Sequence, residues 1–259
     1  MEQHNLSYIH PDAKIADNVK IGPFVTIEAD VEIGEGTEIH SGAVILNGSR
    51  IGRNCRIHSS AVIGGVPQDL KFKGEKTLAI IGDNTVIREF ATINRGTASK
   101  GKTVIGNNCL IMAYCHVAHD CNVGDGVIMS NSVQMAGEVV VDPCAVIGGG
   151  TLIHQFTHIG SYCMIQGGSG LTKDIPPYSM VGRTPAKYMG LNIVGLRRRG
   201  FSSEQIIQIQ EMYRILYMSG LNVTHACEKI EAECPQTPER DYLISFIKSS
   251  DRGIIAGNM

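Results

Sequence analysis

Aliphatic side chains recur at every sixth position along most of the chain. Ten consecutive positions spaced by six are isoleucine, from Ile9 to Ile63, and the same frame continues to Leu171. Only three positions in this frame are not aliphatic: Asp69, Glu75 and Ser99. A period of six is not helical, because the apolar face of a helix recurs every three or four residues. It fits a short strand followed by a tight turn.

Two further columns of the repeat support this interpretation. Glycine often follows the aliphatic residue, as in Ile21-Gly22 and Ile51-Gly52, and the chain holds 30 glycines. A small or β-branched residue often stands four places after the aliphatic one, as at Ala13 and Val19. Three units close a triangular coil, so each residue meets its equivalent 18 positions later, and stacked coils pair as parallel strands about 4.8 Å apart.

The pattern therefore predicts a mainly β protein, and it covers residues 9 to 176. It resembles the hexapeptide-repeat, left-handed parallel β-helix. The left hand is implied by this resemblance alone, since general rules for crossover connections favour the opposite hand. We expect a β-helix over residues 1–190 and a small helical domain over 191–259, because a solenoid needs a cap.

Two segments interrupt the repeat without shifting its phase. They lie near residues 66–80 and 98–104, and each replaces whole six-residue units. We expect both to bulge from a coil as loops. The first is rich in cations, with Lys71, Lys73 and Lys76 close to Asp69. Loops on a rigid scaffold often carry function, so the first loop is a candidate for ligand binding.

Beyond Pro176 and Pro177 the spacing of apolar residues becomes helical. Residues 202–220 predict one helix, which Ser202 or Ser203 caps and Gly220 ends. Residues 222–234 and 239–249 predict two more. A basic run of three arginines, 197 to 199, precedes them. It is either a solvated surface or, beside a phosphate-bearing ligand, an anion clamp.

Composition narrows the class of protein. The formal charge is −2, which gives no global electrostatic case for binding nucleic acid. The first residues lack the apolar core of a signal peptide, and no run of 18 apolar residues predicts a membrane span. Most of the eight cysteines fall on the small column of the repeat, where they are expected to pack rather than form disulfides or bind zinc. We expect a cytoplasmic protein with reduced thiols.

One of the nine histidines stands apart from the others. His119 alone occupies the third column of the repeat, at a corner where other units place turn-forming residues. One coil later comes Gly137, and the next coil brings Gln155 beside His154. Glycine lets a ligand approach its backbone N–H closely. A base, an accessible amide and further polar groups in one ladder indicate an acyl-transfer site.

Several motifs carry a closer resemblance. They occur in this order: PQDLKFKGE (67–75), TINRGT (92–97), HVAHDC (116–121), MAGEVVVD (135–142), IHQF (153–156), KDIPPY (173–178) and NIVGLRRRGF (192–201). Over its whole length the chain resembles the UDP-N-acetylglucosamine O-acyltransferases that open lipid A biosynthesis. The resemblance implies a homotrimer with active sites between neighbouring subunits. It also implies transfer of an (R)-3-hydroxyacyl chain from acyl carrier protein to the 3-hydroxyl of UDP-N-acetylglucosamine.

The resemblance also implies a role for each matching residue. His119 matches the general base, Asp120 the residue that orients it, and Gly137 the backbone donor to the oxyanion. The substrate-binding positions are Gln68, Asp69, Lys71, His116, His154, Gln155, Asn192, Arg198 and Arg199, and Gly167 matches the acyl-chain groove. No cofactor and no metal is implied. No serine or cysteine matches a covalent nucleophile, so direct transfer is expected.

Two positions depart from this family's pattern. Asn94 and Glu138 stand where the best-known members carry histidine, so no polarising ring is expected at 94.

Three other functions stay open on the residues alone. One is a hexapeptide-repeat acetyltransferase that uses acetyl-CoA. Another is a zinc enzyme that draws on His116, His119, His154 and His158, although these fall in different columns. The third is a scaffold without catalytic activity.

Overall fold

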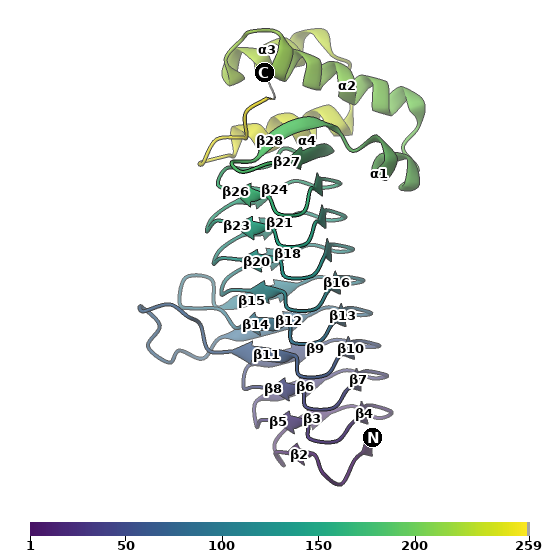
Figure 1. The fold of residues 1–259 in the computed structure, drawn as a ribbon, viewed down its shortest axis with the longest axis vertical. Helices are drawn as coiled ribbons and strands as arrows, with labels where there is room; N and C mark the ends of the chain where they lie inside the picture. Colours follow the sequence, from purple (N-terminus) through teal and green to yellow (C-terminus); the bar gives the residue numbers. More distant parts are fainter. Residues whose placement is uncertain (258–259) are drawn as a thin grey trace.

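The chain coils into a three-sided prism of short parallel strands (Figure 1). The computed structural model describes residues 1–257. Sheet I contains β1 (Glu2–Gln3), β4 (Lys20–Ile21), β7 (Glu38–Ile39), β10 (Arg56–Ile57), β13 (Val86–Ile87), β16 (Leu110–Ile111), β19 (Ile128–Met129), β22 (Val146–Ile147), β25 (Met164–Ile165), β27 (Ser179–Gly182) and β28 (Lys187–Leu191).

The other two faces of the prism are sheets II and III. Sheet II contains β2 (Tyr8–Ile9), β5 (Thr26–Ile27), β8 (Val44–Ile45), β11 (Val62–Gly65), β14 (Thr92–Asn94), β17 (His116–Val117), β20 (Gln134–Met135), β23 (Leu152–Ile153) and β26 (Gly170–Leu171). Sheet III contains β3 (Lys14–Ile15), β6 (Val31–Ile33), β9 (Ser49–Ile51), β12 (Leu78–Ile81), β15 (Lys102–Ile105), β18 (Asn122–Val123), β21 (Val140–Val141) and β24 (His158–Ile159).

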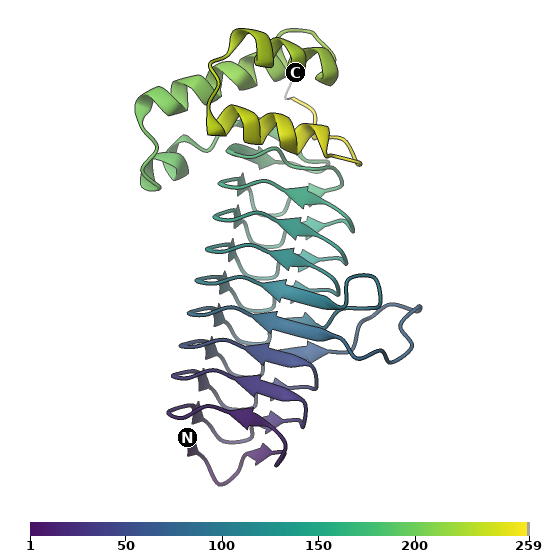
Figure 2. The same cartoon turned by 180° about the vertical axis from the view of Figure 1, so that it is seen from behind.

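The register between coils is the one that the six-residue period predicts. Within the repeat, neighbouring parallel strands pair residues 18 positions apart, as in Lys20 with Glu38. The offset grows only where a loop is inserted, as in Arg56 with Val86. The first loop joins β11 to β12 and the second joins β14 to β15, so both leave the corner between sheets II and III. They project side by side from the prism (Figures 1 and 2).

The aliphatic column fills the interior of the prism. Ile27, Ile45 and Ile63 are fully buried, one above the other. The cysteines of the small column are buried with them, and all eight are free thiols. Burial raises the pKa of the Cys121 and Cys163 thiols to about 12, which keeps them protonated and unreactive. The prediction that these cysteines serve packing is confirmed.

The corners depend on one left-handed residue in each turn. The third and fourth positions of the repeat form the turn, and the fourth has a positive φ, as at Asn18, Asn54 and Asp120. Asparagine and aspartate tolerate this conformation better than other residues with a Cβ. The third position, where His119 lies, therefore carries no such restriction.

Four helices cover the C-terminal end of the prism (Figure 2): α1 (Ile193–Arg198), α2 (Ser203–Met218), α3 (Val223–Glu233) and α4 (Pro238–Lys248). Ser202 caps α2 in a capping box with Gln205, as the sequence indicated. Within residues 1–257, none of the helices combines the length and the apolar character needed to cross a bilayer.

Two elements near the cap were not predicted. The antiparallel hairpin of β27 and β28 extends sheet I beyond the repeat. The helix α1 is capped by Asn192, and its last turn carries two of the three arginines of the basic run.

Candidate active site

His119 and Gly137 lie against each other on the corner between sheets II and III. His119 follows β17, and Gly137 occupies the same place after β20, one coil further along. A Cβ built on Gly137 would lie 2.6 Å from both Cε1 and Nε2 of His119. The imidazole therefore packs directly on the backbone of Gly137, and no side chain fits between them. This is the adjacency that the register predicted.

Asp120 binds the far side of the imidazole. Its Oδ2 lies 2.8 Å from Nδ1 of His119. The positive φ of Asp120, 61°, turns its side chain back along the corner, where it is 1% exposed. Burial is the strongest single influence and acts to raise the pKa of Asp120. The hydrogen bonds from Thr97, His119 and Lys100 together outweigh burial, so the pKa lies below its ordinary value and the carboxylate stays ionised.

His119 lies at the wall of a cavity rather than at an open vertex. Its exposure is only 8%, because Asp120 and Gly137 enclose the ring. The cavity has a volume of about 630 Å³ and runs along the outer face of sheet II. It combines apolar side chains, such as Leu152, with polar groups. The predicted site residues that line it are Gln68, His116, His119, Gly137, His154 and Gln155.

His116 adds a second imidazole to this wall. Its Nδ1 lies 2.7 Å from Oγ1 of Thr92 on the neighbouring strand. Burial lowers the pKa of His116, and the nearby His119 lowers it further. His116 is therefore mainly neutral near pH 7 and puts no positive charge beside His119.

Gly137 offers a free hydrogen-bond donor at the same place. Within residues 1–257 its backbone N–H has no acceptor, whereas the next amide, of Glu138, donates to the carbonyl of His119 at 3.0 Å. An N–H without an acceptor beside an imidazole can stabilise an oxygen that becomes negatively charged.

Seven predicted site residues are not among those that line this cavity, and one of them is Asp120, which lies behind His119. In the first loop, Oδ1 of Asp69 accepts the N–H of Lys71 at 2.9 Å. Asn192 caps α1 and donates to the carbonyl of Tyr162 at 2.9 Å. Arg198 and Arg199 are exposed at the end of α1. Gly167 is exposed on the corner between sheets I and II.

The second loop contributes residues that the sequence did not indicate. Thr97, Lys100 and Thr103 hydrogen bond with Asp120. Nζ of Lys100 also lies 3.8 Å from a carboxylate oxygen of Glu138. Thr97 belongs to the TINRGT motif, which was the only available signal. The inserted loop removes it from the 18-residue register, so spacing gave no reason to bring it to Asp120.

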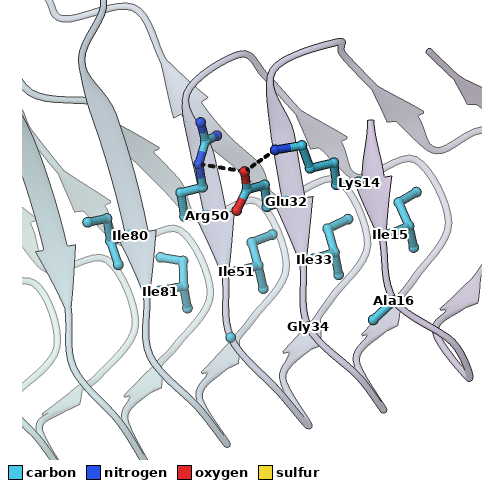
Figure 3. A pocket seen from close by; sticks show the side chains of 11 residues that line it. Lys14, Ile15, Ala16, Glu32, Ile33, Gly34, Arg50, Ile51, Ile80 and Ile81 are labelled. Carbon is cyan, nitrogen blue, oxygen red and sulfur yellow. Dashed lines mark hydrogen bonds and ion pairs between the residues drawn. The ribbon is translucent and has the colours of Figure 1, made fainter. Parts of the chain in front are cut away.

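A second cavity, of about 600 Å³, lies on sheet III and has a different chemical character. Figure 3 shows its column of isoleucines beside a ladder of charged side chains. Nζ of Lys14 lies 3.0 Å from Glu32, and Nε of Arg50 lies 3.8 Å from the same carboxylate. No histidine is among the residues that line it, and its charges are already paired. The cavity on sheet II is therefore the candidate active site.

Metal ligands do not gather at this corner or elsewhere in residues 1–257. No group of three or more histidine, cysteine, aspartate or glutamate side chains there is arranged to hold a metal ion. In particular, His116 bonds with Thr92 and His119 with Asp120.

Comparison with family models divides the chain as its repeat does. The model described as "Udp N-acetylglucosamine O-acyltransferase; Domain 2" matches residues 174–255. The model for the bacterial transferase hexapeptide (six repeats) matches residues 102–137. The model described as "GMPPB C-terminal domain" matches residues 4–104.

Related proteins match over almost the whole chain. The acyl-[acyl-carrier-protein]–UDP-N-acetylglucosamine O-acyltransferase of Thermodesulfovibrio yellowstonii is 46% identical over 254 residues, which is 98% of each chain. The crystal structure of a UDP-N-acetylglucosamine acyltransferase from Bacteroides fragilis has a TM-score of 0.96 and 56% identity, covering 97% of this chain and 99% of that one. A solved structure of the protein LpxA from Acinetobacter baumannii has a TM-score of 0.95 and 43% identity, covering 98% of this chain and 99% of that one.

Proposed function

Since this chain belongs to the acyl-[acyl-carrier-protein]–UDP-N-acetylglucosamine O-acyltransferase family, we propose how its corner site performs the transfer. The enzyme moves an acyl chain from acyl carrier protein to UDP-N-acetylglucosamine, the first step of lipid A biosynthesis. The transferred group in our proposal is an (R)-3-hydroxyacyl chain, and the acceptor atom is the oxygen of the sugar's 3-hydroxyl.

His119 acts as the general base in this proposal. A sugar hydroxyl is a poor nucleophile at neutral pH, and an imidazole suits the removal of its proton, a role typically worth about 10² to 10⁴ in rate. Asp120 accepts a hydrogen bond from Nδ1 of His119 and so leaves Nε2 free to accept the proton. Nε2 is also the ring nitrogen that packs against Gly137.

The remaining steps balance within the same group of residues. The sugar oxygen attacks the thioester carbonyl, and the resulting oxyanion is held by the N–H of Gly137, a donor typically worth about 10² to 10³. The tetrahedral intermediate expels the thiolate of the carrier, which takes the proton from His119. The observation that carries this proposal is the His119–Asp120 pair packed on a glycine with an unused N–H.

No covalent acyl-enzyme is required. Cys121 is the cysteine nearest to His119 in the sequence, but it is buried in the core with its thiol protonated. Direct attack by the sugar is consistent with this arrangement.

The substrate-binding residues that the cavity of a single chain lacks come from a neighbouring subunit in a homotrimer. The outward residues of sheet I support self-association. They change from charged, at Lys20, Glu38 and Arg56, to apolar for the rest of the repeat: Val86, Leu110, Ile128, Val146 and Met164. Such an apolar row marks an interaction surface. In the proposed trimer the sheet I row of one subunit packs against the next subunit, whose cavity then receives Asn192, Arg198, Arg199 and Gly167 next to its own Gln68, Asp69 and Lys71 of the first loop.

The proposed location is the cytoplasm. Eight free cysteines fit a reducing compartment, and the proposed donor and acceptor are an acyl carrier protein and a nucleotide sugar.

The first experiment offers UDP-N-acetylglucosamine with hydroxyacyl-carrier thioesters of several lengths, or with acetyl-CoA, and identifies the product by mass spectrometry. We expect 3-O-acylation from the carrier thioester only. Activity with acetyl-CoA alone would instead make the protein an acetyltransferase. An acceptor with an amine at carbon 3 tests the choice of nucleophile.

The second experiment tests the base. His119→Ala should lower kcat by about 10² to 10⁴, because the hydroxyl loses its proton acceptor. His225→Ala, an exposed histidine on α3, is the matched control and should leave kcat unchanged. Near-normal turnover by a correctly folded His119→Ala protein would refute the assignment.

A further inference from the structure

The second loop closes around the carboxylate of Asp120. Thr97 reaches it twice, through its N–H to Oδ1 at 2.9 Å and through its Oγ1 to Oδ2 at 2.6 Å. The N–H of Lys100 also points at Oδ1, at 3.2 Å. From the start of β15, Oγ1 of Thr103 accepts the backbone N–H of Asp120 at 2.8 Å. Three donors from one loop thus hold one buried side chain.

These contacts replace a counter-ion. Among the described residues, no lysine or arginine nitrogen lies within 4 Å of the Asp120 carboxylate, and the one basic side chain that contacts it is His119. A buried carboxylate without a cation is stable only when hydrogen bonds satisfy its oxygens. The loop supplies those bonds, and Thr97 itself is only 7% exposed.

The hydroxyl of Thr97 has a specific place in this set. It donates to Oδ2, and Oδ2 is also the oxygen that Nδ1 of His119 contacts at 2.8 Å. The two backbone donors hold Oδ1 instead. The carboxylate is thereby fixed against rotation, with Oδ2 aimed at the imidazole. A second bond, from the N–H of Ser99 to Oγ1 of Thr97 at 3.1 Å, orients the hydroxyl.

We propose that Thr97 is a positioning residue for the acyl transfer, acting through Asp120 to hold His119 in the tautomer and orientation that accept the sugar's proton. This inference rests on the proposed role of His119 as the base. Thr97 touches no substrate in this scheme. Its hydroxyl determines where Oδ2 lies, and Oδ2 determines which imidazole nitrogen is free.

The test compares three substitutions by steady-state kinetics with the full-length protein. Thr97→Val keeps the shape and removes the hydroxyl, Thr97→Ala removes it without adding bulk, and Thr97→Ser restores it. Losing a hydrogen bond to a charged group should lower kcat by about tenfold or more. We expect KM for UDP-N-acetylglucosamine to stay within about twofold, and Thr97→Ser to recover most of the activity.

A matched control separates positioning from stability. Thr37 is fully buried on another corner, donates to the carbonyl of Gly52 at 2.9 Å and accepts from the N–H of Cys55 at 3.1 Å. Thr37→Val removes a buried hydroxyl of the same kind far along the chain from His119. It should lower Tm and leave kcat unchanged. Either Thr97→Val or Thr97→Ala suffices for the comparison, provided that its Tm is no lower than that of the control.

The pH profile gives a readout that loss of stability does not imitate. The Thr97 hydrogen bond helps to lower the pKa of Asp120, so its removal raises that pKa. As the pH falls, Asp120 becomes protonated at a higher pH in the variant than in the wild type, so the part of the acid limb of kcat/KM that protonation of Asp120 causes moves to higher pH. Three other titratable groups face this pair: His116 from β17, Lys100 from the second loop and Glu138 from the next corner. They are the same in wild type and variant.

The outcomes separate this inference from the proposed function. Unchanged kcat and an unmoved acid limb in Thr97→Val, with His119→Ala inactive, would overturn the role of Thr97 and leave the base assignment intact. Thr97→Ser as impaired as Thr97→Val would also overturn it, because the methyl group would then be what matters. Full activity of His119→Ala would refute the base itself.

Discussion

Gly137 is a glycine for a reason of space. The atoms of His119 occupy the volume into which any Cβ at position 137 would project. The same contact brings the backbone of Gly137, whose N–H is the proposed oxyanion donor, against the imidazole. One missing side chain therefore serves both the base and the donor.

Adding that side chain should separate the two groups. In Gly137→Ala the methyl group has to push the imidazole aside, since a Cβ carbon cannot approach the ring atoms as closely as 2.6 Å. We expect kcat to fall at least tenfold, while the fold persists because the corner lies outside the core. Gly220→Ala is the control: Gly220 has φ 74° with no atom within 4 Å of its added Cβ. It should cost about 1 kcal/mol of stability and leave kcat unchanged. Wild-type kinetics for Gly137→Ala would contradict the close packing.

At this scale the sequence revealed the residues of the repeat and missed those of the second loop. His119, Gly137 and Gln155 were found because a fixed step of 18 brings them to one corner. Thr97 was missed because an inserted loop lies between it and the coil to which it bonds. Periodicity predicts contacts only where the chain keeps its period.

The first loop is the element that presents Gln68, Asp69 and Lys71. It is attached to the prism partly through Arg95, which follows β14. The guanidinium lies 5.5 Å from the ring centroid of Phe72 and donates from Nη1 to the carbonyl of Asn47 at 3.2 Å. Arg95 thus links the middle of the loop to a coil on the side away from His119.

Removing this attachment should affect sugar binding more than chemistry. A cation–π contact of this kind is worth about 0.5 to 2 kcal/mol. We expect Arg95→Ala to raise KM for UDP-N-acetylglucosamine several-fold with kcat nearly constant, and to make the loop easier to cleave in limited proteolysis. Arg95→Lys keeps the charge but not the planar stacking, so its KM should lie between the KM of the wild type and that of Arg95→Ala. A fall in kcat at constant KM would contradict a role limited to the loop.

Elements outside the repeat were predicted unevenly for a similar reason. The helices α2, α3 and α4 were found because each has an apolar face and cap residues within its own sequence. The hairpin β27–β28 and the short helix α1 depend on packing between the prism and the cap. Neither is long enough to show a period of its own.

At the scale of the whole molecule, the apolar row of sheet I faces outward from the prism. Ile128 lies at its middle, half-buried on β19. In Ile128→Glu a charge faces the proposed partner, and burying an unpaired charge is costly. We expect a monomer in light scattering, with activity lost because the neighbour's residues are absent. Glu38→Gln, on the charged half of the same sheet, should remain a trimer. A fully active monomer would refute the shared site.

Each additional coil lengthens the prism along its axis. The length from the N-terminus to the catalytic corner and the length from that corner to the helical cap are therefore set independently. Eighteen extra residues inserted between β4 and β7 would add one coil on the N-terminal side of the catalytic corner. The corner and the helical cap would keep their positions relative to each other. The same insertion between β24 and β27 would move the helical cap one coil further along the prism and carry the arginines of α1 away from His119. The number of coils between the catalytic corner and the helical cap therefore sets the distance from His119 to these arginines. The number of coils on the N-terminal side of the corner can change without affecting that distance.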